Sequence, residues 1–290
     1  MEMPDSPARA VAEKPRGEEF SFPGGNVAYF DTSAWNDLLD HPDRERVVRR
    51  LREADVSVVA SMFCAVEVAN TSSLDRRREL STLMRGLHGA LPLLGHPMEM
   101  AVPVARAILD GGDDYLFPEN PSGAIVLKFL EDPTDDLQRQ DFLEWRRRME
   151  AKFEKVFEQL KPPAPDHSIN FLTRDLVEGE SMLEVLTWFE PAREAAITID
   201  QMRQVCDAHH DSIWTALRGM LAYWIHIAFR HAGKKRPNAF DLWPAVYLGL
   251  PIHVFVTNDD QLLAAAREIN KFLKVPRHVL TLDAFIARLE

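Results

Sequence analysis

Four short apolar runs interrupt a chain whose other segments mostly carry apolar residues at helical spacing. The runs are NVAYF at 26–30, VSVVAS at 56–61, IHVFVT at 252–257 and HVLTL at 278–282. Short, continuously apolar runs are typical of strands buried on both faces, as in a parallel sheet covered by helices. The pattern therefore predicts an α/β fold with three layers, α/β/α, around a central parallel sheet.

The segments between and after these runs predict the helices that cover the sheet. Their apolar residues recur every three to four positions, as on one face of a helix. The sequence predicts one or two helices over 32–55, a continuous helix over 62–87, and further helices over 239–250, 259–273 and 283–290.

Strand-like runs almost vanish between 95 and 236, where amphipathic helical segments alternate with joints rich in Pro and Gly. The sequence therefore predicts an all-helical insertion over 95–236 in an α/β domain built from 23–94 and 237–290. Residues 1–22 mix Pro, Ala and charged residues without periodicity, which predicts a flexible leader.

Composition narrows the classes of partner. The 290 residues include 34 basic and 45 acidic side chains, for a net charge of −11. Such a balance argues against unselective binding to polyanions or anionic membranes, so any contact with nucleic acid has to use a local patch. There is no apolar stretch long enough for a membrane span, and the two cysteines form no paired motif. We expect a cytoplasmic protein that does not bind a membrane.

Four acids stand at the predicted junctions of strands and helices. Asp31 ends the first run, Glu67 lies on the helix after the second, Asp241 begins a helix, and Asp259 follows the third run. Carboxylates brought to one sheet edge repel one another unless protons or cations neutralise them, and oxygen ligands favour Mg²⁺ or Mn²⁺ over zinc. A simpler interpretation also holds for Asp31, which could cap the helix that follows it.

The segments VAYFDTSAW, VSVVASMFCAVEVAN, AFDLWPAVYLGLPIHVFVTNDDQL and HVLTLDAFIARL resemble, in this order, the conserved blocks of PIN-domain ribonucleases. The resemblance covers roughly 26–92 and 237–290. It implies that Asp31, Glu67, Asp241 and Asp259 bind Mg²⁺ or Mn²⁺ and hydrolyse RNA. Thr257 matches the hydroxyl residue two positions before the last acid, while Asp260 matches no required position but could assist.

The resemblance also implies partners. Compact PIN ribonucleases often act as toxins held by an inhibitory protein, and homodimers are expected in the family. The chain departs from the compact pattern because Glu67 and Asp241 lie 174 positions apart. The excess is the predicted insertion, for which the family offers no role.

A basic segment, Lys234, Lys235 and Arg236, lies just before Asp241 in an otherwise acidic chain. It is a candidate for binding RNA phosphates at the mouth of the site. The aromatic residues at 214–240 could stack on bases, but their spacing equally predicts the buried stripe of a helix. The arginine triplets at 76–78 and 146–148 are more typical of solvated helix faces, because acids lie close to them in sequence.

Two alternatives stay open at the level of function. The same chemistry could act on DNA, or the chain could be a non-catalytic PIN-like module that binds proteins through the insertion. The segment CDAHHD at 206–211 is most simply a polar helix segment. It could also hold a transition metal or contact substrate, but it lacks a second ligand pair at zinc-site spacing. A phosphatase of the haloacid type would need a second acid at position 33, which is Ser33.

Overall fold

The computed structural model describes residues 26–88, 93–111, 121–159, 196–208, 212–230 and 239–289. The predicted leader over 1–22 lies outside these ranges. The described chain is mixed α/β, with more helix than strand, and its strands form one parallel sheet in the order β2-β1-β3-β4. The strands are β1 (Asn26–Phe30), β2 (Val56–Val59), β3 (Val254–Val256) and β4 (His278–Leu280). The prediction of a parallel sheet from four apolar runs is confirmed.

The strand order explains why two of the four acids, Asp31 and Asp259, lie at the same edge of the sheet. Ala28 of β1 pairs with Val58 of β2 on one side and with Val254 of β3 on the other. The chain thus winds outward from β1 in both directions, and β1 and β3 flank the point where the winding reverses. In open parallel sheets, ligands bind beyond the carboxyl ends of strands at this point. Asp31 and Asp259 follow these two strands.

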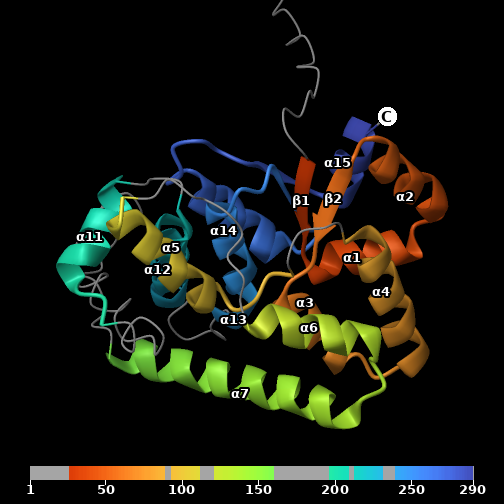
Figure 1. Ribbon diagram of the computed structural model, residues 1–290, viewed down its shortest axis with the longest axis horizontal. Helices are drawn as coiled ribbons and strands as arrows, with labels where there is room; N and C mark the ends of the chain where they lie inside the picture. The colour runs from red at the N-terminus through yellow and green to blue at the C-terminus, as the bar shows by residue number, and fades with distance from the viewer. Residues whose placement is uncertain are drawn as a thin grey trace, which may run out of the picture.

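Helices lie on both sides of the sheet, as expected when right-handed crossovers run outward in opposite directions. In Figure 1, α1 and α2 lie on one side of β1 and β2, and α14 lies on the other. This arrangement is compatible with the predicted three layers. The helices of the α/β part are α1 (Thr32–Asp40), α2 (Arg44–Glu53), α3 (Met62–Asn70), α4 (Leu74–Leu87), α13 (Ala239–Leu242), α14 (Asp260–Asn270) and α15 (Leu282–Leu289).

Two predicted helices differ in the structure. The helix predicted over 62–87 is broken into α3 and α4, because Thr71 is extended and the Ser73 hydroxyl accepts the Arg76 N–H as a new helix cap. Ser and Thr side chains favour such caps over helix interiors. The helix predicted over 239–250 is only one turn of α-helix followed by a 3₁₀ helix, η1 (Trp243–Gly249). Pro244 explains this change, since it lacks an N–H and clashes with the preceding turn.

The described helices between 95 and 236 pack on the α/β part. They are α5 (Pro97–Leu109), α6 (Pro121–Glu131), α7 (Asp136–Gln159), α11 (Ile199–Ala208) and α12 (Ile213–Arg230). Buried residues of these helices and of the sheet form one hydrophobic cluster. Trp214, Leu217, Leu221 and Trp224 belong to it, which confirms the interpretation of this stripe as core.

A close backbone approach joins this region to the segment before β3. A Cβ placed on Gly249 of η1 would lie 2.5 Å from the Cα of Ile213 and from the Ser212 carbonyl oxygen. Only glycine permits this distance, so α12 rests directly on the segment that leads from α13 into the sheet.

The solvated-face prediction for the triplet at 76–78 is wrong for Arg77. This side chain is buried and donates to the carbonyl oxygens of Thr71, Ser72 and Pro133. It therefore satisfies the backbone of the break between α3 and α4, which local charge spacing does not reveal.

No helix in the described part of the chain combines the length and apolar character needed to cross a membrane.

Candidate functional site

Asp31 is fixed where β1 leaves the sheet. Its N–H donates to the Val256 carbonyl oxygen of β3 at 3.0 Å, so it lies between the two central strands. Its Oδ1 accepts the Ala34 N–H at 3.0 Å and caps α1, as the simpler interpretation predicted. The side chain is only 6 % exposed. Loss of hydration raises the pKa of Asp31 to about 6, although the hydrogen bonds from Ala34, Ser33 and Thr257 oppose this rise.

Ser33 joins Asp31 to the end of β3, a role that the sequence analysis did not predict. Its hydroxyl donates to Asp31 Oδ1 at 2.8 Å and accepts the N–H groups of Asn258 at 2.8 Å and Asp259 at 3.1 Å. One donor and two acceptors are the full capacity of a serine hydroxyl. The position where a haloacid phosphatase would need an acid thus holds two strand ends together.

Asp259 occupies at β3 the place that Asp31 occupies at β1. Its Oδ1 accepts the Leu262 N–H at 2.7 Å and caps α14, and its side chain is exposed. The buried Thr257 hydroxyl accepts the Asp259 N–H at 3.1 Å. Thr257 therefore supports the acid that follows it. Asp260 is exposed at the first position of α14, and no described hydrogen bond connects it to the other acids.

Glu67 and Asp241 lie on helices and meet at one cation, Arg146 of α7. The Arg146 Nη1 donates to Glu67 Oε1, and Nη2 lies 3.7 Å from Asp241 Oδ1. Arg146 is 22 % exposed, so the solvated-face prediction for the triplet at 146–148 is wrong at this residue. Nothing in the local sequence singles it out, because Glu67 and Asp241 are far from it along the chain.

Electrostatic interactions connect three of the four acids, Glu67, Asp241 and Asp259. The pKa of Asp241 is raised to about 6, chiefly by loss of hydration and further by the charges of Glu67 and Asp259, while Arg146 opposes the rise. Asp241 is still 51 % exposed, so water reaches it. The carboxylates of Glu67 and Asp259 thus both act on Asp241, which places three of the predicted acids within electrostatic reach of one another.

The chemistry of this donor set fits a hard divalent cation. It consists of oxygen ligands only, and two of the carboxylates already share one positive charge, that of Arg146. The fit is one of chemistry rather than of a preformed cage. Within the described ranges, no three His, Cys, Asp or Glu side chains are grouped so that they could hold a metal ion.

Several predicted residues fall outside what the structure describes. Lys234, Lys235 and Arg236 belong to an undescribed segment, as do His209 and His210. The backbone of Cys206 lies on α11, but its side chain is not described. The predicted substrate patch and the candidate metal segment at 206–211 therefore stay predictions. Cys64 is buried.

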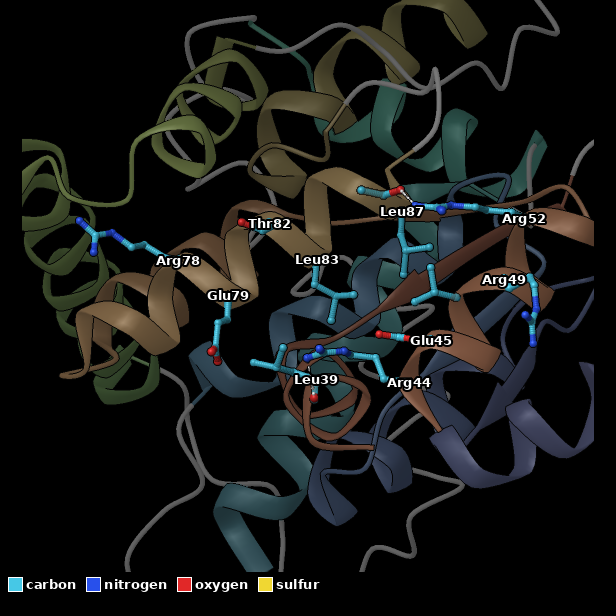
Figure 2. Close-up of a pocket in the computed structure, with 12 residues that line it drawn as sticks. Leu39, Arg44, Glu45, Arg49, Arg52, Arg78, Glu79, Thr82, Leu83 and Leu87 are labelled. Carbon is cyan, nitrogen blue, oxygen red and sulfur yellow. Dashed lines mark hydrogen bonds between the residues drawn. The ribbon is translucent and has the colours of Figure 1, made fainter. Parts of the chain in front are cut away.

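A surface groove lies elsewhere, between the α1–α2 pair and α4 (Figure 2). None of the four acids lines it. Arg44 donates a hydrogen bond to the Leu39 carbonyl oxygen, and Arg52 donates one to the Gly86 carbonyl oxygen. These bonds connect α2 to α1 and to α4. Its lining is Leu39, Arg44, Glu45, Val48, Arg49, Arg52, Arg78, Glu79, Thr82, Leu83, Gly86 and Leu87. The groove thus mixes charges of both signs and contributes nothing to the acidic site.

Comparisons with protein-family models, with curated proteins and with solved structures found no match for this chain. The resemblance to PIN-domain ribonucleases stays a prediction based on the four sequence blocks.

Proposed function

We propose that the chain is a metal-dependent endoribonuclease with a PIN-like fold, which hydrolyses RNA at the site formed by Asp31, Glu67, Asp241 and Asp259. One observation carries the proposal: acids from four separate segments act on one region at the carboxyl edge of a parallel sheet. Asp31 and Asp259 are linked there through Ser33, and Glu67 and Asp259 both raise the pKa of Asp241. Carboxyl groups with raised pKa values that influence one another at the end of a sheet are typical of functional sites.

The proposed role of each acid follows from the element that positions it. Asp31 and Asp259 each use Oδ1 to cap a helix, which orients the carboxylate at the site. Glu67 and Asp241 face Arg146 from helices and would supply the remaining oxygen ligands. A Mg²⁺ or Mn²⁺ ion held by these groups would activate water and stabilise charge on the scissile phosphate. Thr257 fixes the backbone of Asp259, and Asp260 is an exposed neighbour that could contact that ion through water.

Lys234, Lys235 and Arg236 would hold the RNA backbone, since they precede α13 and Asp241 by only a few residues. This part of the proposal rests on sequence proximity and on the affinity of basic side chains for phosphate. The preference for RNA over DNA, the cytoplasmic location, a homodimer and an inhibitory protein partner follow from the resemblance and from composition.

The test is cleavage of end-labelled RNA and single-stranded DNA by wild type, Asp31→Asn and Asp200→Asn, each with Mg²⁺, Mn²⁺ or EDTA. Asp200 is an exposed acid on α11, paired with Arg203, and provides a matched control. We expect metal-dependent cleavage of RNA that falls at least 100-fold in Asp31→Asn and is unchanged in Asp200→Asn. Cleavage that persists in Asp31→Asn would reject the site, and cleavage of DNA alone would reject the substrate.

A non-catalytic role has one observation in its favour: Arg146 is already the ion-pair partner of both Glu67 and Asp241. In that case the acids would be structural ion-pair partners of α7. Metal would then leave the melting temperature unchanged in wild type, whereas a bound ion stabilises the folded state.

A further inference from the structure

Arg146 comes to the acidic site from the helical region, on an element remote in sequence from both acids it contacts. The helix α7 lies alongside α3 and α13, which carry Glu67 and Asp241 (Figure 1). Aromatic packing fixes this placement, because Trp145 lies 6.0 Å from Phe63 and 5.6 Å from Phe240 between ring centroids. The guanidinium is therefore brought to the acids by the packing of α7.

The guanidinium is held by more than a single ion pair. It lies 5.0 Å from the ring centroid of Phe240, and its Nε donates to Glu150 at 3.0 Å. Partial burial alone would lower the pKa of Arg146, but the hydrogen bond to Glu150 and the charges of Glu67 and Asp241 raise it. Arg146 therefore carries its positive charge at neutral pH.

The neighbours of Arg146 behave differently. Arg147 and Arg148 are exposed, and within the described ranges Arg148 pairs with Glu144 on its own helix. One arginine of the triplet thus faces the acids, while the next two face water. This contrast supplies a control at the adjacent position.

Glu150 is a second ion-pair partner for the Arg146 guanidinium. It lies on α7 four residues after Arg146 and bonds to Nε, while Nη1 and Nη2 face Glu67 and Asp241. Arginine has five donors arranged in a fork, so it can keep the bond to Glu150 and withdraw the other end. Because both residues of this pair are on one helix, the pair does not depend on the acidic site.

We propose that Arg146 is a built-in competitor of the divalent cation: it occupies the positive-charge position between Glu67 and Asp241, and metal binds only when its guanidinium withdraws toward Glu150. The inference rests on the proposed function, since it concerns how that site is regulated. A cation and a guanidinium cannot share the same carboxylate oxygens without strong repulsion. Metal affinity is then set by the helical region as well as by the four acids.

The test measures Mn²⁺ binding directly, from the electron paramagnetic resonance signal of free Mn²⁺ during titration. The proteins are wild type, Asp31→Asn, Arg146→Gln, Arg146→Lys and Arg147→Gln. We expect Arg146→Gln to bind Mn²⁺ at least tenfold more tightly than wild type, Arg146→Lys to fall between them, and Arg147→Gln to match wild type. Melting curves in EDTA check that each variant is folded.

The outcomes separate the two proposals. If Asp31→Asn abolishes binding while Arg146→Gln binds like wild type or more weakly, the metal site stands and the competition is rejected. If neither wild type nor Arg146→Gln binds Mn²⁺ at millimolar concentration, the metal site itself is rejected, and the competition with it. Should Arg146→Gln fail to fold, the comparison of Arg146→Lys with Arg147→Gln decides, because equal affinities there contradict the competition.

Discussion

The two halves of the acidic site are built in different ways. Asp31 and Asp259 follow central strands, cap the next helices and are joined through one serine hydroxyl. Glu67 and Asp241 lie on helices, and both pair with the Arg146 side chain of α7. The first pair is held by hydrogen bonds at the strand ends. The second pair is held by the side chain of Arg146, which is far from both acids in sequence but contacts them in the structure.

This difference implies that the two halves respond differently when a cation binds or leaves. A carboxylate fixed by the backbone at a strand end stays in place whatever cation is present, because its hydrogen bonds are made within the junction. A carboxylate paired with an arginine can exchange that partner for an ion without any change in the backbone. The strand-borne half therefore provides a fixed frame, and the helix-borne half provides the part that responds to cations.

The largest effect on stability is expected in the fixed half, from Asp31→Asn in EDTA. The pKa of Asp31 is about 6 in the folded state against an ordinary 3.8, so the folded state binds the extra proton between these values. The contribution of Asp31 to stability is thus highest below pH 4 and falls as pH rises to 6. At pH 7.5 the substitution should stabilise the fold by about 2 to 3 kcal/mol, since each pKa unit corresponds to about 1.4 kcal/mol.

Urea unfolding of both proteins at pH 7.5 and pH 4 measures this effect. At pH 4 the gain should shrink to less than about 1 kcal/mol, because Asp31 is then protonated in the folded wild type. A gain of equal size at both pH values, or a loss at pH 7.5, would show that burial of the Asp31 charge does not cost stability.

The next effect is expected from Ser33→Ala, which removes the link between β1 and β3. Asp31 loses a donor, and the Asn258 N–H loses the acceptor given by the Ser33 hydroxyl. Loss of a hydrogen bond to a carboxylate together with an unpaired N–H predicts destabilisation by about 2 kcal/mol at pH 7.5. Equilibrium unfolding in urea gives the value.

Thr32→Ala is the matched control for Ser33→Ala, because no described hydrogen bond involves the Thr32 hydroxyl. We expect it to change stability by less than about 0.5 kcal/mol. Equal effects of the two substitutions would mean that Ser33 acts only as a residue of the first helical turn.

The smallest effect is expected in the responsive half, from Glu67→Gln and from Asp241→Asn in EDTA. The exposed fractions of these side chains are 34 % and 51 %, so water screens their ion pairs with Arg146. Each substitution should change the free energy of unfolding by less than about 1 kcal/mol, as is usual for pairs near the surface. A decrease of more than about 2 kcal/mol in the free energy of unfolding, measured in urea, would show that the ion pairs with Arg146 stabilise the fold as strongly as the contacts of the other half.

Local sequence was enough to predict the residues whose position depends on local geometry. Asp31 and Asp259 could be predicted at the sheet edge because an apolar run followed by an acid marks a strand end that starts a helix. Ser33 could not be predicted as a link, because its two acceptor contacts come from Asn258 and Asp259, more than 200 positions away. The helix ends near Thr71 and Pro244 could not be predicted from apolar spacing, because they depend on the Ser73 cap and on the proline ring.

The sequence by itself determined the four strands, their parallel pairing and the placement of Asp31 and Asp259 at strand ends, because strand and helix periodicity follow from the order of apolar side chains. Only the tertiary structure decided which charge faces the two acids on helices, Glu67 and Asp241. Arg146 and Arg148 have the same chemistry and similar neighbours along the chain, yet one contacts Glu67 and the other faces water. The packing of α7 against α3 and α13 makes that choice, since it sets which side of the helix faces the site.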